Sequence, residues 1–156
     1  RSVFGGKLTT YRKQAEHAIE KLSKYYPNIG AAWTKNCVLP GGSFAGTRED
    51  YAATLRRRFP FITEEMARHY ARTYGSNTEV LLKDATSLDD LGELFGHHFY
   101  EAELRYLVDN EWVRVTDDAI WRRTKEGMWL NDEQQARITA WLAEHGKKPA
   151  SLSLAS

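Results

Sequence analysis

Two glycines and a lysine stand directly before a predicted helix and form the strongest candidate for a binding site. The segment reads GGKLTT from Gly5 to Thr10. Glycines let a ligand approach the backbone closely, and a helix start presents free N–H groups and positive potential. The segment therefore predicts contact with an anionic group. It is not a Walker A loop, because Leu8 rather than Ser or Thr follows Lys7. A simple turn before a helix also explains the glycine pair.

A second group of residues with metal-binding chemistry is His97, His98 and Glu101. His97 and Glu101 would share a helix face if the helix began early enough, but the group has no clear fourth ligand. Packed or solvated histidines explain these residues better, and we predict no metal. His69 is expected to pack between helices or to form a local hydrogen bond.

Two basic runs could contact phosphate or anionic lipid headgroups. The first is Arg56–Arg58 and the second is the sequence RRTK at 122–125. Nearby acids and the helical setting favour a solvated or ion-paired face for the first run. For the second run, a fixed ion pair or an interdomain contact is as good an explanation as simple solvation.

Composition restricts the function classes. Lys and Arg total 22 against 21 Asp and Glu, giving a formal net charge of +1, which argues against a nucleic-acid binder. Cys37 is the single cysteine, so no internal disulfide can form and the reducing cytosolic side is favoured. No apolar run approaches the roughly 20 residues that cross a bilayer, so any membrane contact is expected to be peripheral. Because a turn is already under way at Gly5, we expect the chain to be cut from a longer protein.

Periodicity and capping residues predict helices along most of the chain. The first follows Thr10 and ends before Pro27; the next two open at Thr47 and Thr63, and the third ends at Gly75. Capping-box pairs Ser76/Glu79 and Ser87/Asp90 predict two short helices. Further helices are expected over 98–109, with Glu101, Glu103, Arg105 and Asp109 free to face water, over 117–123, and over 131–146. Of the five tryptophans, most are expected in the core.

These elements predict an all-α fold: a single compact domain of about six or seven helices, with at most a short extended segment near 112–115. The topology stays open at this point.

Several segments together resemble the FAD-dependent glycerol-3-phosphate dehydrogenases. They are GGKLTTYR over Gly5–Arg12, the LPGG turn at 39–42, ARHYARTYGSN over 67–77, Glu101–Tyr106 and the RRTK run. The similarity covers essentially the whole chain and is strongest to the bacterial aerobic, quinone-reducing members.

The resemblance implies a division of the chain: 1–12 as the end of the flavin-binding domain or its linker, 13–148 as a C-terminal helical domain, and 149–156 as a flexible tail. It implies that Gly6, Lys7, Leu8 and Thr9 contact FAD, and that Lys7 also meets the substrate phosphate. The nucleotide-binding glycine fingerprint is absent, so no catalytic residue is expected here and the upstream flavin-binding domain must supply it.

For the full-length enzyme the resemblance implies oxidation of glycerol 3-phosphate to dihydroxyacetone phosphate, with electrons passed to quinone. The enzyme would be cytoplasmic and peripherally associated with the inner membrane. The chain alone would be inactive and would not hold FAD. A homodimer through exposed aromatic residues is compatible with this interpretation. The alternative is a free-standing helical interaction module; a nucleic-acid partner is not expected.

Overall fold

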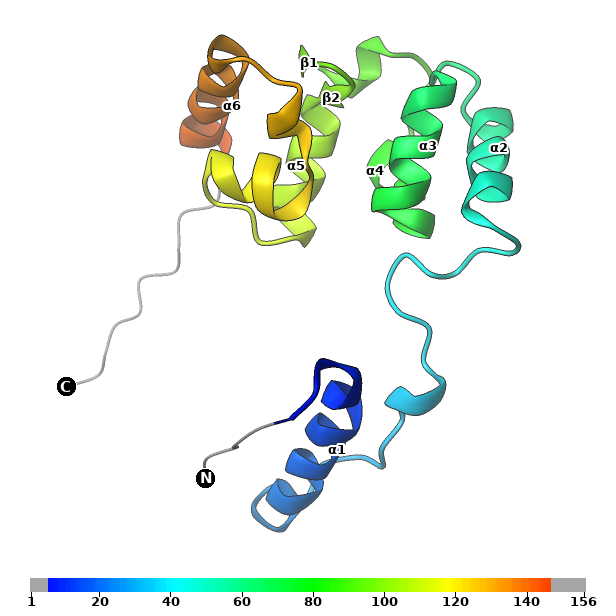
Figure 1. Cartoon of the computed structure of the whole chain (residues 1–156), viewed down its shortest axis with the longest axis vertical. Coiled ribbons are helices and arrows are strands. Elements are labelled where there is room, and N and C mark those ends of the chain that lie inside the picture. The colour runs from blue at the N-terminus through cyan, green and yellow to red at the C-terminus, as the bar shows by residue number, and fades with distance from the viewer. Residues whose placement is uncertain (1–5, 147–156) are drawn as a thin grey trace, which may run out of the picture. The chain divides into compact units, whose positions relative to one another are not determined.

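The computed structural model describes residues 6–146 and groups the chain into two compact units, Arg1–Leu39 and Pro40–Ser156 (Figure 1). The sequence predicted one compact domain. Residues 27–46, around the boundary between the units, contain neither an α-helix nor a strand. Gly5 and the expected tail at 149–156 lie outside the described residues.

The first unit is built around one helix. A 3-10 turn at Leu8–Thr10 leads into α1, Tyr11–Leu22, and a further 3-10 turn follows at Ser23–Tyr25 before Pro27. These bounds confirm the predicted first helix. No side chain in the described part of this unit is buried, so the unit has no core of its own. A third 3-10 turn lies at Thr34–Asn36.

The second unit begins with a pair of packed helices, α2 at Arg48–Arg58 and α3 at Glu64–Thr73. Thr47 caps α2 through a reciprocal capping box with Asp50, and Thr63 caps α3 by accepting from the backbone N–H of Met66. Such caps satisfy backbone donors that a helix start leaves free, typically for about 1 kcal/mol each. Both predicted helix starts are confirmed.

A close backbone contact follows α3. A 3-10 turn at Gly75–Asn77 leads into the short α4, Thr78–Leu82. Gly75 has a φ of 53°, and a Cβ there would collide with the carbonyl of Gly41, which accepts from Ser76 N–H at 2.9 Å. The predicted Ser76/Glu79 capping box is wrong: the Ser76 hydroxyl accepts from the backbone N–H of Ser43 at 3.3 Å, and α4 begins after Asn77 without a side-chain cap.

A small antiparallel hairpin occupies residues that were predicted to be helical. β1 (Leu94–Gly96) pairs with β2 (Phe99–Tyr100), after a 3-10 turn at Asp89–Leu91. Asp90 accepts from the backbone of Thr86 and Ser87, so the expected capping pair forms a turn rather than a helix. The next helix, α5, therefore runs over Glu101–Asn110 instead of starting at 98.

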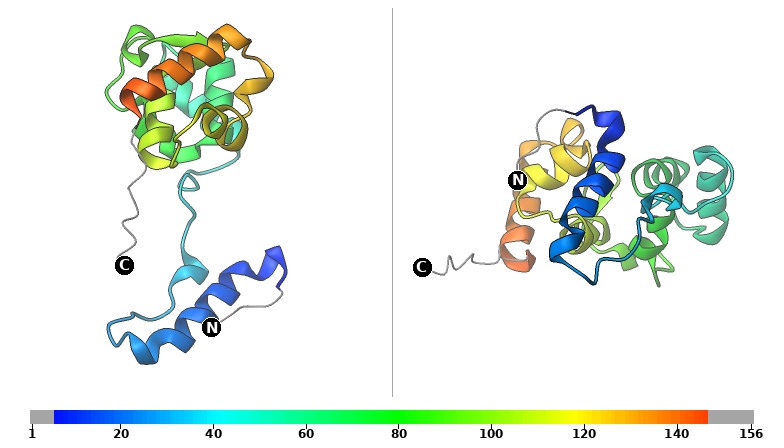
Figure 2. Two further views of the ribbon diagram at one scale, coloured as in Figure 1. Left: turned by 90° about the vertical axis from the view of Figure 1, so that its left-hand side faces the viewer. Right: turned by 90° about the horizontal axis from the view of Figure 1, so that it is seen from below.

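The C-terminal part of the described chain contains a π-helix and the longest helix. The π-helix spans Asp118–Arg123, a 3-10 turn follows at Glu126–Met128, and α6 spans Asp132–His145 with an Asn131/Gln134 capping box. α6 packs beside β1, and the left view of Figure 2 shows this helix next to the hairpin. Residues 112–115 form no strand with any described residue; Trp112 has a positive φ of 58°, outside the strand region.

The core lies between α2, α3, α5, the hairpin and α6. Its fully enclosed members include Tyr70, Phe95, Phe99, Leu104 and Ile138. The expectation that most tryptophans are buried is wrong: Trp141 is buried, whereas the other four are exposed. Residue type alone cannot separate core aromatics from aromatics at an interface, since both settings favour them.

Within residues 6–146 the structure contains six α-helices, one π-helix and one two-stranded sheet. The predicted mostly helical fold of six or seven helices is therefore confirmed, with the small extended part at 94–100 rather than near 112–115. None of the described helices has the length and apolarity that a bilayer crossing requires.

Candidate functional site

The predicted binding segment, Gly6 to Thr9, is exposed at the start of α1. Gly6 has a φ of 123°, a backbone conformation that L side chains rarely adopt, so the position favours glycine. Lys7 precedes the 3-10 turn, and its carbonyl accepts from both the N–H and the hydroxyl of Thr10 at 2.9 Å. The first N–H groups of this helical segment have no acceptor within it. The segment thus has the open backbone and positive end that an anion requires.

A polar network ties α1 to the turn at Thr34–Asn36. Glu16 Oε1 accepts from the Thr34 hydroxyl at 2.5 Å and pairs with Arg12 at 2.8 Å. The Thr34 hydrogen bond, with the Arg12 charge, lowers the pKa of Glu16. Arg12 ends the GGKLTTYR segment, so this network fixes the end of the candidate site to the rest of its unit.

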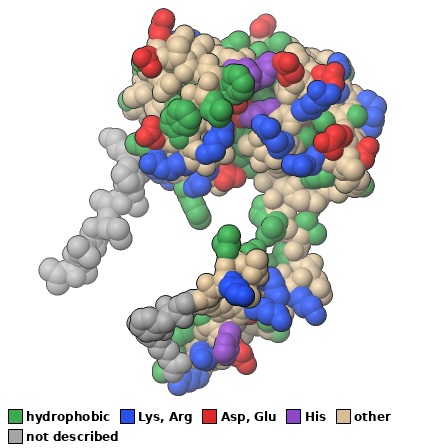
Figure 3. All heavy atoms as spheres, in the orientation of Figure 1, with side chains coloured by type: hydrophobic (Ala, Val, Ile, Leu, Met, Phe, Trp, Pro, Cys, Tyr) green, Lys and Arg blue, Asp and Glu red, His purple; other side chains and the backbone are tan. Residues whose placement is uncertain are grey.

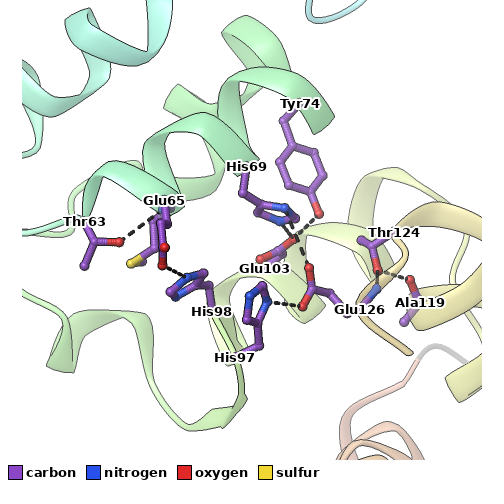
Figure 4. Close-up of polar contacts among 11 residues, drawn as sticks. Thr63, Glu65, His69, Tyr74, His97, His98, Glu103, Ala119, Thr124 and Glu126 are labelled. Atoms are coloured by element: carbon purple, nitrogen blue, oxygen red, sulfur yellow. Dashed lines mark hydrogen bonds and ion pairs between the residues drawn. The ribbon is translucent and has the colours of Figure 1, made fainter. Parts of the chain in front are cut away.

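The second unit contains a buried histidine–glutamate cluster that the sequence did not predict (Figure 4). His69 Nε2, from α3, lies 2.7 Å from Glu103 Oε1, from α5, and the Tyr74 hydroxyl donates to the same oxygen at 2.6 Å. Glu103 has no exposed surface, although it was expected to face water. Burial, with the Glu103 charge, raises the pKa of Tyr74 well above its usual range, so this hydroxyl stays a donor.

A second buried carboxylate completes this cluster. Glu126 Oε2 lies 2.9 Å from His97 Nδ1, and its Oε1 lies 3.7 Å from His69 Nδ1. Burial opposes charge on His69, but the carboxylates of Glu103 and Glu126 outweigh it and raise the pKa of His69. The cluster therefore places the His69 imidazole between two buried carboxyl groups that favour its protonated form.

The structure does not bring His97, His98 and Glu101 together as metal ligands. His97 lies in the hairpin turn and bonds Glu126, His98 bonds Glu65 at 2.9 Å, and Glu101 pairs with Arg105 at 2.6 Å. His97 and Glu101 do not share a helix face, because α5 begins only at Glu101. Over residues 6–146 the structure shows no cluster of His, Cys, Asp and Glu suited to a metal ion.

The histidines line a pocket of about 400 Å³ on the second unit. Figure 3 shows histidine side chains on the visible face of this unit with Lys and Arg side chains close by. Trp129 forms part of the pocket wall and stacks on His97, with ring centroids 5.3 Å apart. The pocket thus combines arginines, histidines and one exposed aromatic ring.

The two basic runs differ in how they are held. In the first, Arg58 pairs with Glu79 at 2.6 Å, and all three arginines are exposed. In the second, Arg122 pairs with Asp118 at 2.8 Å and Arg123 donates to the Glu111 carbonyl at 2.7 Å. Of the explanations left open for the second run, the structure shows an ion pair at Arg122, although both of its arginines are exposed; the first run is a largely solvated face.

Comparison with known proteins finds a matching family model and similar relatives. A family model described as the C-terminal domain of alpha-glycerophosphate oxidase matches residues 32–147. The chain is 68% identical over 152 residues to the aerobic glycerol-3-phosphate dehydrogenase of Escherichia coli strain K12, covering 97% of this chain and 30% of that protein. It is 42% identical over 149 residues to a glycerol-3-phosphate dehydrogenase of Pseudomonas aeruginosa, covering 95% of this chain and 29% of that protein.

A further relative carries a different name. The chain is 40% identical over 141 residues to the D-erythritol 1-phosphate dehydrogenase of Brucella abortus, covering 90% of this chain and 28% of that protein. The chain therefore spans less than a third of the length of these three relatives, at the 30%, 29% and 28% given for each.

Proposed function

The chain belongs to the family of C-terminal domains of alpha-glycerophosphate oxidase, and we propose that it is the helical C-terminal part of an FAD-dependent glycerol-3-phosphate dehydrogenase. The proposed parent enzyme oxidises glycerol 3-phosphate to dihydroxyacetone phosphate and passes electrons to quinone. The names of the relatives from E. coli and B. abortus both specify a phosphorylated polyol. They support a phosphate monoester as the substrate class.

One observation carries the proposed dependence on an upstream domain: the first unit presents apolar side chains that its own residues do not bury. Leu8 is 88% exposed, Tyr11 59% and Ile19 49%. A helix of 12 residues is marginal in water without tertiary packing. We infer that this face of α1 packs on the flavin-binding domain in the parent enzyme.

The segment Gly6–Thr9 fits the edge of a flavin site. Gly6 lacks the side chain that would block a close approach, and Lys7 carries an exposed positive charge at a helix start. When bound, FAD would accept the two electrons removed from the substrate alcohol. The role proposed for Lys7, Leu8 and Thr9 is to favour negative charge on the flavin or on the substrate phosphate. Alone, the chain would lack the rest of the site and would be inactive.

Within the parent enzyme we assign residues 1–12 to the end of the flavin-binding domain or its linker, 13–148 to the helical domain, and 149–156 to a tail. A cytoplasmic location with peripheral contact to the inner membrane is part of the same proposal. Trp112, which is 77% exposed, supports a contact with lipid, since tryptophan favours membrane interfaces.

Two experiments test this proposal. The parent gene should encode a strand followed by a G-x-G-x-x-G turn several hundred residues upstream of Arg1, as an FAD-binding domain requires. The separately expressed upstream part should then retain flavin and reduce a dye with glycerol 3-phosphate only when this chain is added. An upstream part that is fully active by itself would refute the proposed role, and a gene without the fingerprint would refute the enzyme.

A further inference from the structure

The histidine-lined pocket of the second unit has no role in the function proposed above. Its volume of about 400 Å³ lies in the range of roughly 300–1,000 Å³ found for small-molecule sites. α2 contributes Arg48, α3 contributes Arg72, and the turn before α6 contributes Trp129. Because three separate elements form the wall, its geometry is set by the fold of the whole unit.

The pocket's carboxylates are mostly occupied by histidines. Glu126 contacts His97 and His69 with its two oxygens, and Glu65 bonds His98 at 2.9 Å. Because Glu126 is buried and turns both oxygens toward histidines, it has little capacity left for a cationic ligand. Glu49 is the remaining lining carboxylate, and it forms no ion pair with a described residue.

The arginines of the pocket have fewer ion-pair partners than its carboxylates have. Arg68 pairs with Glu64, whereas neither Arg48 nor Arg72 forms an ion pair with any residue between 6 and 146. Of the lining groups that form no ion pair with a residue between 6 and 146, two are the guanidinium groups of Arg48 and Arg72 and one is the carboxylate of Glu49. A guanidinium presents a planar fork of N–H donors that matches phosphate oxygens, and its charge persists at every physiological pH.

His69 and Trp129 add to this preference. His69 lies on the pocket wall between the buried carboxylates, where its raised pKa extends the range in which it is protonated. Trp129 is held flat against His97, within 17° of parallel, and offers an apolar surface to the organic part of a ligand. His97 itself has a φ of 52°, a strained conformation that its bond to Glu126 helps to hold.

We propose that this pocket binds a small phosphate-class oxyanion, inorganic phosphate or a phosphate monoester, with Arg48 and Arg72 as its principal ligands. The proposal uses only the contacts of the second unit and does not depend on the dehydrogenase assignment. It gives this domain a binding function of its own.

The test is titration of the full 156-residue chain with inorganic phosphate and, separately, with glycerol 3-phosphate. Binding is followed by calorimetry and by the imidazole NMR signals of His69 and His98, at constant ionic strength in chloride. We expect saturable binding and selective shifts of these signals. If phosphate and glycerol 3-phosphate bind with equal affinity, the phosphate group alone accounts for binding. If glycerol 3-phosphate binds more tightly, its organic part also contacts the pocket at Trp129. Both results support the site.

Arg72→Gln and Arg48→Gln should each weaken binding at least about tenfold, the loss expected for one hydrogen bond to a charged group. Arg56→Gln is the matched control, because Arg56 is exposed on α2 and does not line the pocket. Circular dichroism and urea unfolding verify that each variant is folded. The site is refuted if neither probe gives saturable shifts at millimolar concentration, if chloride competes equally, or if Arg56→Gln weakens binding as much as both pocket variants.

Discussion

The imidazole of His69 joins two helices of the second unit through Glu103, with 2.7 Å between Nε2 and Oε1. The partner carboxylate is completely buried, and its second oxygen has no hydrogen-bond partner among the described residues. A buried carboxyl group without partners is strongly unfavourable, so the contact with His69 and the hydrogen bond from Tyr74 stabilise Glu103 in its buried position.

Replacing Glu103 by Gln should lower the pKa of His69. Glutamine is uncharged, so this substitution removes the carboxylate that does most to raise the pKa of His69. Desolvation of the buried imidazole, which lowers this pKa, is then opposed only by the charge of Glu126. NMR titration of the His69 ring measures the change. Glu65→Gln is the control, since Glu65 contacts His98 and should leave the His69 titration unaltered. An unchanged His69 pKa in Glu103→Gln would show that the carboxylate does not stabilise the imidazolium.

The stability of the second unit should fall as pH rises above neutral. The folded-state pKa of His69 lies above its ordinary value of 6.5, with Glu103, Glu126 and Arg72 as the charged neighbours that act on it. Its contribution is therefore complete below pH 6.5 and is lost as pH rises through the higher folded value. Urea unfolding from pH 6 to pH 9 checks the sign. His69→Asn should flatten the dependence, and a wild-type stability that rises across this window would contradict it.

Gly75→Ala should destabilise the second unit by about 2–3 kcal/mol, because the positive φ and the Gly41 carbonyl both exclude a Cβ. Denaturant unfolding gives the value. Gly30→Ala is the matched change at a glycine with open space around its Cβ position and should alter stability by less than about 0.5 kcal/mol. Equal effects would mean that the contact between Gly41 and Gly75 is not tight in solution.

Lys7→Ala in the parent enzyme should weaken flavin or substrate binding, seen as flavin loss or a raised KM, while thermal unfolding of this chain stays the same. The physical reason is that the described structure uses the Lys7 backbone carbonyl, which alanine retains, and leaves the side chain exposed. Arg12→Ala provides a contrast, since it removes the ion pair to Glu16. Unaltered kinetics in Lys7→Ala would exclude Lys7 from the site.

The helices were predictable where local signals agreed with the tertiary structure. Thr47, Thr63 and Asn131 each mark a helix start because their side chains accept from the backbone three residues later, a bond that depends on local sequence alone. The helix predicted over 131–146 was equally readable: α6 spans Asp132–His145 and buries Ile138, Trp141 and Leu142.

The other features of the fold depend on contacts between residues far apart in the sequence. The hairpin at 94–100 forms because Phe95 and Phe99 reach the core, a gain that short-range capping patterns do not register. Because Glu103 is charged, it was predicted to face water. It lies, however, three residues after Tyr100 and four before Leu107, and therefore on the inward face of α5. That spacing, with a histidine on a neighbouring helix, was the signal for the cluster. The binding role of Gly6–Thr9 remains a prediction, because the contacts of this segment depend on the domain that it is proposed to meet.

The lack of a core in the first unit bears on how the chain would respond to a protease. A segment whose side chains are all at least partly accessible opens at little cost in free energy, so trypsin should reach Lys13, Lys21 and Lys24 well before it reaches the arginines of α3. Digestion would then stop near residue 40 and leave a resistant fragment. Protection of those lysines in the assembled enzyme would report docking of α1 directly.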